Sequence, residues 1–372
     1  MEIVSTSIHR CFQGLNDPRL ETRCRHELMP ILVISLLAVV AGADSFNDIE
    51  LFAKSKKDWL CTFLDLPNGI PSHDTFNRVF SSISSEEFSK CFITWTQSLA
   101  ENIRGVVAID GKTLRRSFDS AAEPTFLHMV SAWSSENDLV LGQIRTAAKS
   151  NEITAIPQLI AMLDLQDSIV TIDAAGCQKN IAQNILDADA DYVLALKANQ
   201  RGTFEKAQSL FAKLKKEDAH DIVFTQHEKT EKNRGRLETR TACSIDVSGM
   251  DVFSSWAGLN SISEIISTRE TKNHKTTVET RYFISSLPAD AESLSKAIRS
   301  HWGIENSLHW VLDVVFKEDY ARNRKDHSAE NMAILRHMAI NFIKKETSSK
   351  TSIRGKRLKA AWNNDYLIKL LT

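Results

Sequence analysis

The sequence predicts an α/β fold: a mixed sheet covered by helices, preceded by a helical region and interrupted by a β-rich insertion. Three observations predict it. Apolar residues recur at helical spacing through residues 1–100. Three short apolar segments, followed by alternating helical and extended segments, fill residues 105–203. Residues 204–291 contain segments that alternate with the two-residue period of hairpin strands.

The helical region contains one continuous apolar run, Leu28–Gly42. This run is shorter than the roughly 20 residues that span a membrane, and it starts too late for an ordinary signal peptide. We therefore expect a buried core helix. Further helices are expected over 45–64 and 84–103, with a helix between them that is capped by Ser72 or Asp74.

The core and the insertion follow from the same patterns. Because three strands capable of antiparallel pairing precede alternating helices and strands, the sheet should be mixed. Strands are expected over 105–110, 125–135, 138–147, 168–176 and 191–200, hairpin strands over 221–247, 261–270 and 276–286, and helices over 150–165 (capped by Ser150 or Asn151), 177–190 and 290–316.

Composition excludes few functions. The chain has 372 residues, 42% hydrophobic and 25% charged, typical of a soluble globular protein with two or three domains. A net charge of −1 gives no overall sign of a nucleic-acid partner, so such a role requires local basic patches. Six cysteines without a C-x-x-C pair argue against a structural zinc site and a disulfide framework, and favour the reducing cytoplasm.

Two aspartates stand at the ends of apolar core strands. Asp110 follows "VVAI", Asp173 follows "IVTI", and a glycine comes soon after each. If both strands belong to one sheet, ionising two neighbouring carboxylates at the edge of the core is costly unless a cation binds them. Oxygen ligands without a nearby Cys or His pattern favour Mg²⁺ or Mn²⁺. For either aspartate alone, a turn or a helix cap is the alternative.

A third acid is expected from a helix that faces the same edge. Glu305 is the best candidate, with His301 and His309 one turn to either side of it. A local ion-pair ladder is the alternative, and the order H-x-x-x-E-x-x-x-H is not the usual order of zinc ligands. The acids that compete for the third position all follow Glu305: Asp313, Glu318 and Asp319.

Several sequence blocks occur in the order found in DDE transposases. They are "VVAIDGKTLRRS", "KSNEITAIPQLI", "IVTIDAAGCQKNIA", "DYVLALKANQ" and "HWGIENSLHWVLDVVFKED", preceded by "IPSHDTFNRVF". The chain most resembles the insertion-sequence branch that includes the H-repeat-associated proteins of Rhs elements, over nearly its whole length. The resemblance implies a ribonuclease-H-like core and an acid triad at Asp110, Asp173 and Glu305 that uses Mg²⁺, with Mn²⁺ as a substitute. It also implies phosphodiester hydrolysis at element ends and transfer of the freed 3′-hydroxyl into target DNA.

Two positions depart from related families. The arginine expected four residues before the glutamate is His301, and the lysine expected seven residues after it is Leu312. Lys317, Arg322 and Arg324 are candidates for the missing positive charge.

Basic residues near the triad are expected to contact DNA phosphates, although those after Asp110 could equally form a solvated charged loop. The expected nucleic-acid contacts are Lys112, Arg115, Arg116, Lys197, Arg234, Arg236, His301, Arg322 and Arg324. The segment 344–359 has seven basic residues and one acid, and is expected either to contact phosphates or to be a solvated tail.

Four domains are expected: a helical domain that recognises DNA ends or only packs and dimerises (1–100), a ribonuclease-H-like core (101–203 with 292–345), a β-rich insertion (204–291) and a basic C-terminal segment (346–372). The expected partner is double-stranded DNA, with a homodimer in the DNA complex and no membrane. Two alternatives to an active transposase stay open: an immobile DNA-binding relic, and a structure-specific nuclease with the same fold and metals.

Overall fold

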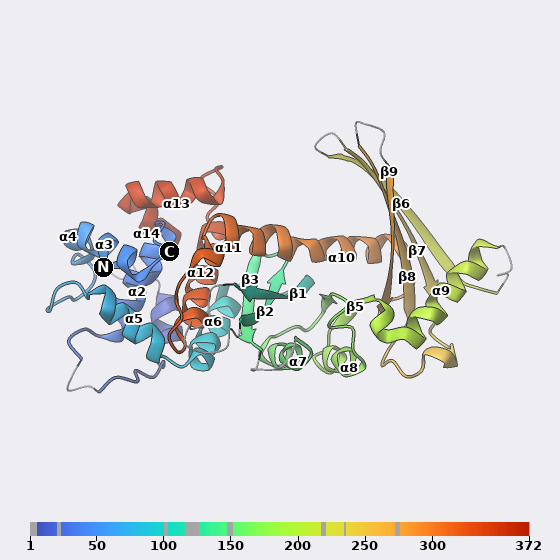
Figure 1. The fold of residues 1–372 in the computed structure, drawn as a ribbon, viewed down its shortest axis with the longest axis horizontal. Coiled ribbons are helices and arrows are strands. Elements are labelled where there is room, and N and C mark those ends of the chain that lie inside the picture. The colour runs from blue at the N-terminus through green and yellow to red at the C-terminus, as the bar shows by residue number, and fades with distance from the viewer. Residues whose placement is uncertain are drawn as a thin grey trace. The chain divides into compact units, whose positions relative to one another are not determined.

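The computed structural model describes residues 6–20, 24–99, 103–115, 126–146, 152–216, 221–233, 236–271 and 276–371. The chain forms two compact units, and Figure 1 traces it through them. Unit 1 comprises Met1–Asn102, Gly111–Lys149 and Glu305–Thr372, and unit 2 comprises Ile103–Asp110 and Ser150–Ile304. Two of the four points at which the chain passes between the units therefore lie directly after Asp110 and directly before Glu305.

Unit 1 is mostly helical and has the predicted apolar helix α2 (Leu28–Val40) in its core, where every residue from Pro30 to Val40 is buried. Its other elements are α1 (Thr6–Phe12), α3 (Phe46–Ser55), α4 (Lys57–Leu60), α5 (His73–Ser82), α6 (Ser85–Leu99), β2 (Leu127–Ser134), β3 (Leu139–Arg145), the π-helix η4 (Glu305–His309), α11 (Trp310–Val314), η5 (Glu318–Tyr320), α12 (Ser328–Lys345), α13 (Ile353–Trp362) and α14 (Asn364–Leu371). None of the described helices is long and apolar enough to span a membrane.

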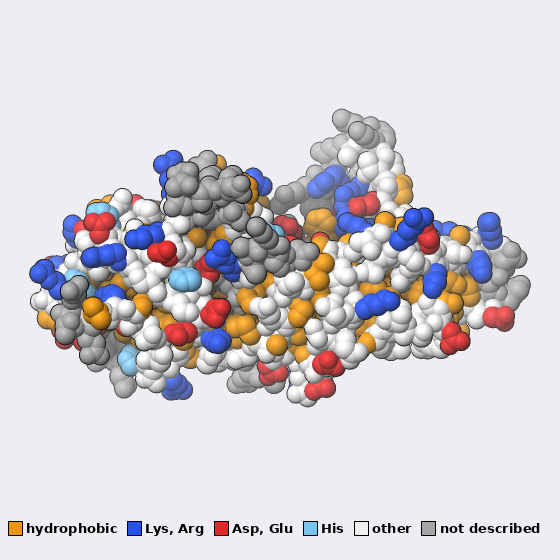
Figure 2. Space-filling model, turned by 60° about the horizontal axis from the view of Figure 1, so that its bottom comes forward, with side chains coloured by type: hydrophobic (Ala, Val, Ile, Leu, Met, Phe, Trp, Pro, Cys, Tyr) orange, Lys and Arg blue, Asp and Glu red, His pale blue; other side chains and the backbone are white. Residues whose placement is uncertain are grey.

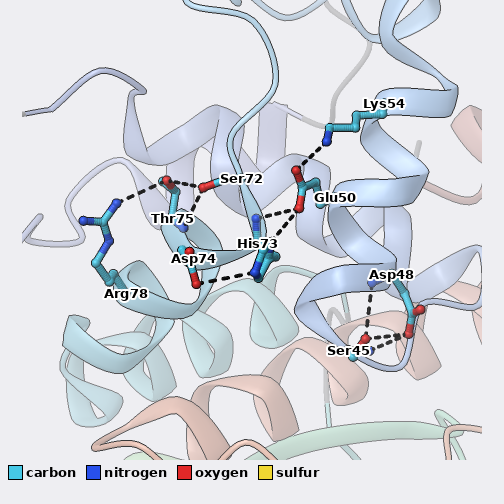
Figure 3. Close-up of polar contacts among 9 residues, drawn as sticks. All are labelled: Ser45, Asp48, Glu50, Lys54, Ser72, His73, Asp74, Thr75 and Arg78. Atoms are coloured by element: carbon cyan, nitrogen blue, oxygen red, sulfur yellow. Dashed lines mark hydrogen bonds and ion pairs between the residues drawn. The ribbon is translucent and has the colours of Figure 1, made fainter.

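Side-chain caps define where two of the N-terminal helices begin (Figure 3). Ser45 and Asp48 form a capping box at the start of α3, which satisfies backbone N–H groups that a helix leaves unpaired. Ser72, and not Asp74, caps α5 by accepting the N–H of Thr75.

The same region shows how α3 and α5 are tied together. Glu50 of α3 accepts the backbone N–H of His73 at 3.0 Å and lies 2.8 Å from its Nδ1. These bonds, together with Lys54, lower the pKa of Glu50 to about 2, and the Lys54 bond makes the largest contribution. The polar contacts therefore fix the start of α5 on α3.

Unit 2 contains a mixed sheet with the strand order β1-β4-β5-β9-β8-β7-β6. Strands β1, β4 and β5 are parallel, and the remaining neighbours are antiparallel. Strand β1 (Gly105–Leu114) begins in unit 2 and continues into unit 1, where it is the neighbour of β2 in the order β3-β2-β1. The other elements of unit 2 are α7 (Glu152–Met162), β4 (Ser168–Ile172), α8 (Lys179–Asp187), β5 (Asp191–Leu196), η2 (Ala198–Gln200), α9 (Arg201–Lys215), β6 (Phe224–Asn233), β7 (Arg236–Asp246), η3 (Asp251–Phe253), β8 (Ser261–Glu270), β9 (Thr276–Ser285) and α10 (Ala291–Ile304).

The structure corrects two details of the expected elements. Strand β1 runs to Leu114 instead of ending at Asp110, and the segment after Gln200 forms the helix α9 before the first hairpin strand begins. The segment of α9 is rich in Lys, Ala, Leu and Gln, which are good helix formers. Its buried Phe211 contacts Tyr282 of the sheet, so α9 covers one face of the hairpin strands.

The hairpin strands are longer than the parallel strands β4 and β5 and project past them, and Figure 1 shows β6–β9 as a group of long strands. Leu196, the last residue of β5, pairs with Tyr282 of β9, and the pairing of β9 with β8 continues from Arg281 to Thr276. At about 3.4 Å per residue, these six residues carry the strands roughly 20 Å beyond the carboxyl end of β5.

The basic C-terminal segment is not a solvated tail as a whole, because two of its cations are buried in unit 1, whereas Lys350, Arg354 and Lys359 are exposed. Lys356 and Arg357 are both less than 10% exposed. Lys356 donates to the carbonyls of Ile343 and Glu346. Arg357 donates to the carbonyls of Val39 and Val315, at the ends of α2 and α11, and its guanidinium lies 4.1 Å from the ring centroid of Phe316. Burial lowers the pKa of Arg357 to about 10.

We expect Arg357→Met to destabilise the protein by about 2–4 kcal/mol, because it leaves two helix-end carbonyls without their buried donor. Urea unfolding followed by circular dichroism measures the change. Arg354→Met is the control, since Arg354 is exposed on the same helix. Equal effects of the two substitutions would contradict a structural role for Arg357.

Candidate active site

Parallel pairing places two aspartates of unit 2, Asp110 within β1 and Asp173 directly after β4, at equivalent positions. Ile109 of β1 pairs with Ile172 of β4, and the next residues along the two strands are Asp110 and Asp173. Neighbouring strands lie about 4.8 Å apart, so the register puts the two carboxylates on adjacent strands at one edge of the sheet. Both residues are partly buried.

The turn after Asp173 fixes the direction of its side chain. Oδ1 accepts the backbone N–H groups of Ala175 at 2.9 Å and Gly176 at 3.3 Å. A Cβ at Gly176 would lie 2.3 Å from the side chain of Ile172, so the close turn requires glycine there. The spacing Asp-x-x-Gly thus has a physical reason: the glycine lets the backbone fold over the strand end and bond the carboxylate.

A third strand contributes to the same edge. Leu194 of β5 pairs with Ile172, and β5 ends at Leu196, directly before the exposed Lys197. The side chain of Asn199 then donates to the carbonyl of Ala174 at 2.6 Å and joins the loop after β5 to the loop after β4. The carboxyl ends of parallel strands are the usual place for ligands in such sheets.

Helix α10 packs across the sheet of unit 2, with Leu294 and Ala297 in a core cluster that includes β5 and β9 residues. His301, near its end, forms a 3.0 Å hydrogen bond through Nδ1 with Thr171 Oγ1. Thr171 lies two residues before Asp173 and therefore on the same face of β4. Thr171 is not among the site residues expected from the sequence, although a polar residue two positions before an acid on a strand is the signal that could have indicated it.

Glu305 is the first residue after α10 and begins the π-helical turn η4. It is exposed, and its Oε2 lies 3.7 Å from Nδ1 of the buried His309. Single π-helical turns are rare and occur often at functional sites. The expected histidine neighbours of Glu305 are therefore present on either side of it along the helix, one of them bound to β4 and the other beside the glutamate.

The three acids that are alternatives to Glu305 as the third metal ligand all lie near Lys112 in unit 1. Lys112 Nζ lies 2.7 Å from Asp313 Oδ1, 3.0 Å from Glu318 Oε2 and 3.7 Å from Asp319 Oδ1. Asp319 also lies 3.5 Å from Arg115, which is itself mostly exposed. The three competing acids thus form ion pairs with basic residues in the sequence block that contains Asp110.

The other expected DNA contacts are spread over several elements. Lys197, Arg236 and Arg322 are exposed and Arg324 is partly buried, whereas Arg116 and Arg234 lie outside the described residues. On the face shown in Figure 2, the visible Lys and Arg side chains are interspersed with Asp and Glu. Contacts of these residues with phosphates stay predictions.

All six cysteines are free thiols, and the one nearest the site is not activated. Burial, and to a lesser extent the charge of Asp173, raise the pKa of Cys177 to about 12. A thiol with such a pKa is almost entirely protonated at neutral pH, so Cys177 is unsuited to act as a nucleophile.

Comparisons with known proteins identify the family of this chain. The families described as "DDE_Tnp_1-associated" and "Transposase DDE domain" match residues 9–96 and 101–342. The candidate transposase YncI of Escherichia coli O157:H7 is 43% identical over 365 residues, which cover 95% of this chain and 92% of YncI. The H repeat-associated candidate transposase YhhI of Escherichia coli K12 is 40% identical over 363 residues, which cover 95% of each chain. The cryo-EM structure of a piggyBac transposase synaptic complex with hairpin DNA aligns with a TM-score of 0.44 and 11% identity over 99% of this chain and 76% of that one.

The family match and the whole-chain similarity confirm the resemblance seen in the sequence blocks. The fold class is also confirmed as an α/β protein with a mixed sheet and a helical N-terminal region. This chain belongs to the DDE transposase family, among the relatives that include the H repeat-associated proteins.

Proposed function

We propose that this protein is a catalytically active, Mg²⁺-dependent DNA transposase of the cytoplasm. It hydrolyses phosphodiester bonds at the ends of its element and transfers the freed 3′-hydroxyl into target DNA. The observation that carries the proposal is the pairing of Ile109 with Ile172, which sets Asp110 and Asp173 on adjacent parallel strands at one edge of the sheet.

Asp110, Asp173 and Glu305 are the proposed catalytic metal ligands. Two features support Glu305 over its competitors. It follows His301 by four residues on the same helical segment, and His301 is bonded to the strand that carries Asp173. The competing acids, in contrast, are paired with Lys112.

The donor set fits a hard divalent cation, because carboxylate oxygens are the ligands that Mg²⁺ prefers. The two N–H groups on Asp173 Oδ1 hold this carboxylate in one orientation. A bound Mg²⁺ or Mn²⁺ would supply a more acidic water and neutralise charge on the phosphate.

The residues around the acids are proposed to position double-stranded DNA, with a homodimer as the working complex. Lys197 lies at the carboxyl edge of the parallel strands, and Arg236 lies at the far end of the projecting hairpin strands, where it pairs with Asn233. His301, Arg115, Arg322 and Arg324, together with Arg116 and Arg234, complete the proposed set. Such contacts orient the backbone of the DNA without reading its sequence.

We expect Arg236→Ala to weaken binding of end DNA and unrelated DNA about equally. One lost phosphate contact lowers the slope of log affinity against log salt by roughly 0.9. Titration at several salt concentrations gives the slope. The control is Arg201→Ala, which removes an 82% exposed arginine that pairs with Glu205. An unchanged slope for Arg236→Ala would remove this residue from the proposed DNA contacts.

A strand-transfer assay tests the proposed function as a whole. The protein is mixed with Mg²⁺, DNA carrying the sequences that flank its gene, and a supercoiled target plasmid. We expect products in which the 3′ ends of the element are joined to the target plasmid. Cleavage without joining would instead identify a nuclease, and DNA binding without either reaction would identify an inactive relic.

A further inference from the structure

Lys112 lies inside a cluster of charges in unit 1. Its side chain is 11% exposed, and its ammonium group contacts Asp313 at 2.7 Å and Glu318 at 3.0 Å, with Asp319 at 3.7 Å. Burial lowers the pKa of Lys112, but Glu318 and Asp313 more than offset this and raise it above its ordinary value. The ammonium group donates a hydrogen bond to Glu318 Oε2, and its contact with Asp313 is an ion pair.

Glu318 is the most buried member of this cluster, with a side chain 2% exposed. Lys112 approaches one carboxylate oxygen, and Arg336 of α12 lies 3.5 Å from the other. Burial raises the pKa of Glu318, yet Lys112, Arg336 and His337 together bring it below its ordinary value. Without Lys112, the buried Glu318 would keep only the more distant Arg336, so the ionised Glu318 depends chiefly on Lys112.

The cluster connects the two stretches of chain that lead to the proposed metal ligands. Lys112 is two residues after Asp110 on strand β1, and Asp313 and Glu318 lie on the elements that follow Glu305. Lys317, directly before Glu318, has a left-handed backbone with φ 50°, which is uncommon for a residue other than glycine. The chain thus makes a specific turn that carries Glu318 to Lys112.

We propose that Lys112 is a positioning residue: by binding Asp313 and Glu318 it holds the end of strand β1 to the segment after Glu305, and so fixes the chain next to two of the proposed metal ligands. The inference rests on the proposed function and gives Lys112 a role other than the phosphate contact expected from the sequence. Misplacing a catalytic group by about 1 Å can cost about 10²-fold in rate, so a small shift of the anchor is enough to be measured.

The test compares Lys112→Met, Glu318→Gln and the double variant. We expect Lys112→Met to lower the cleavage rate about 10²-fold and the affinity for Mn²⁺ about tenfold, as partners that orient metal ligands typically do. The double variant should cleave at least tenfold faster than Lys112→Met, because it no longer buries a carboxylate that has lost its main cation. Electron paramagnetic resonance of free Mn²⁺ measures the affinity of the protein without DNA.

A phosphate contact predicts different results. In that case Lys112→Met lowers the log–log salt slope of DNA binding by roughly 0.9, and Glu318→Gln restores nothing. Losses that simply add in the double variant, or Mn²⁺ affinity unchanged in Lys112→Met, would overturn the positioning role. Lys112→Arg, which keeps the charge, should retain more activity than Lys112→Met and serves if the latter does not fold.

The control for general loss of stability is Lys215→Met. Lys215 lies 2.7 Å from Glu264, whose side chain is 2% exposed, so this substitution also deprives a buried carboxylate of its cation. It should leave Mn²⁺ affinity unchanged. A wild-type protein that neither binds Mn²⁺ nor cleaves DNA overturns the proposed function and this inference with it. If the wild-type protein binds Mn²⁺ and cleaves DNA, but the losses of Lys112→Met and Glu318→Gln simply add in the double variant, only this inference is overturned.

Discussion

Asp110→Asn, Asp173→Asn and Glu305→Gln should each lower DNA cleavage by at least about 10³-fold while leaving the fold and DNA binding largely intact. Each substitution removes a charged ligand with little change in volume. A metal site contributes several kcal/mol to the transition state, and about 4 kcal/mol corresponds to about 10³-fold in rate. Cleavage of a labelled end fragment, with binding measured separately in Ca²⁺, gives the two quantities.

The same amide replacements at acids away from the site provide the controls. Asp164→Asn changes an exposed residue before β4, and Glu292→Gln changes an exposed residue in the first turn of α10. Both should retain wild-type cleavage. Full cleavage by Glu305→Gln would remove Glu305 from the triad and promote Asp313 or Glu318 to the third position.

The two aspartates could be predicted because their signal is local. An apolar run followed by an acid can be recognised from a few neighbouring residues. Parallel pairing of two such runs is then sufficient to place the two acids on adjacent strands. Residue Ser72 as the cap of α5 and the buried helix α2 were predictable for the same reason, since capping and apolar runs are properties of neighbouring residues.

The partners of the basic residues could not be predicted, because they come from distant parts of the chain. Lys112 follows Asp110 closely, which suits a phosphate contact, but its carboxylate partners lie about 200 residues later. Arg357 looks like part of a basic surface segment, yet it bonds the carbonyl of Val39, 318 residues away. A positive charge in a sequence has the same appearance whether a phosphate or a buried carbonyl receives it.

The shift from strand to helix after Gln200 was missed for a different reason. The alternating pattern of the later hairpin strands dominated residues 204–291, and the short helical segment at its start was included with them. The buried positions of α9, Ala207 and Phe211, are four residues apart, which is helical spacing.

Removal of divalent metal should stop both cleavage and strand transfer. Excess EDTA is expected to reduce the rate by at least about 10³-fold, for the same reason as loss of a ligand, and Mg²⁺ or Mn²⁺ should restore it. Ca²⁺ should support binding of end DNA but little chemistry, because its longer and looser coordination suits the tight geometry of two-metal catalysis poorly. Gel assays for cleavage and for binding, run with each metal, separate these effects.

The choice of metal also tests which side chains form the site. With carboxylates as ligands, His301→Gln and His309→Gln should change the rate without changing the order in which metals restore it. The pairing of His301 with Thr171 and of His309 with Glu305 gives both histidines partners within the protein. If Zn²⁺ alone restored cleavage, and replacing the two histidines abolished that recovery, the site would be a histidine–zinc site. That result would overturn the all-carboxylate assignment.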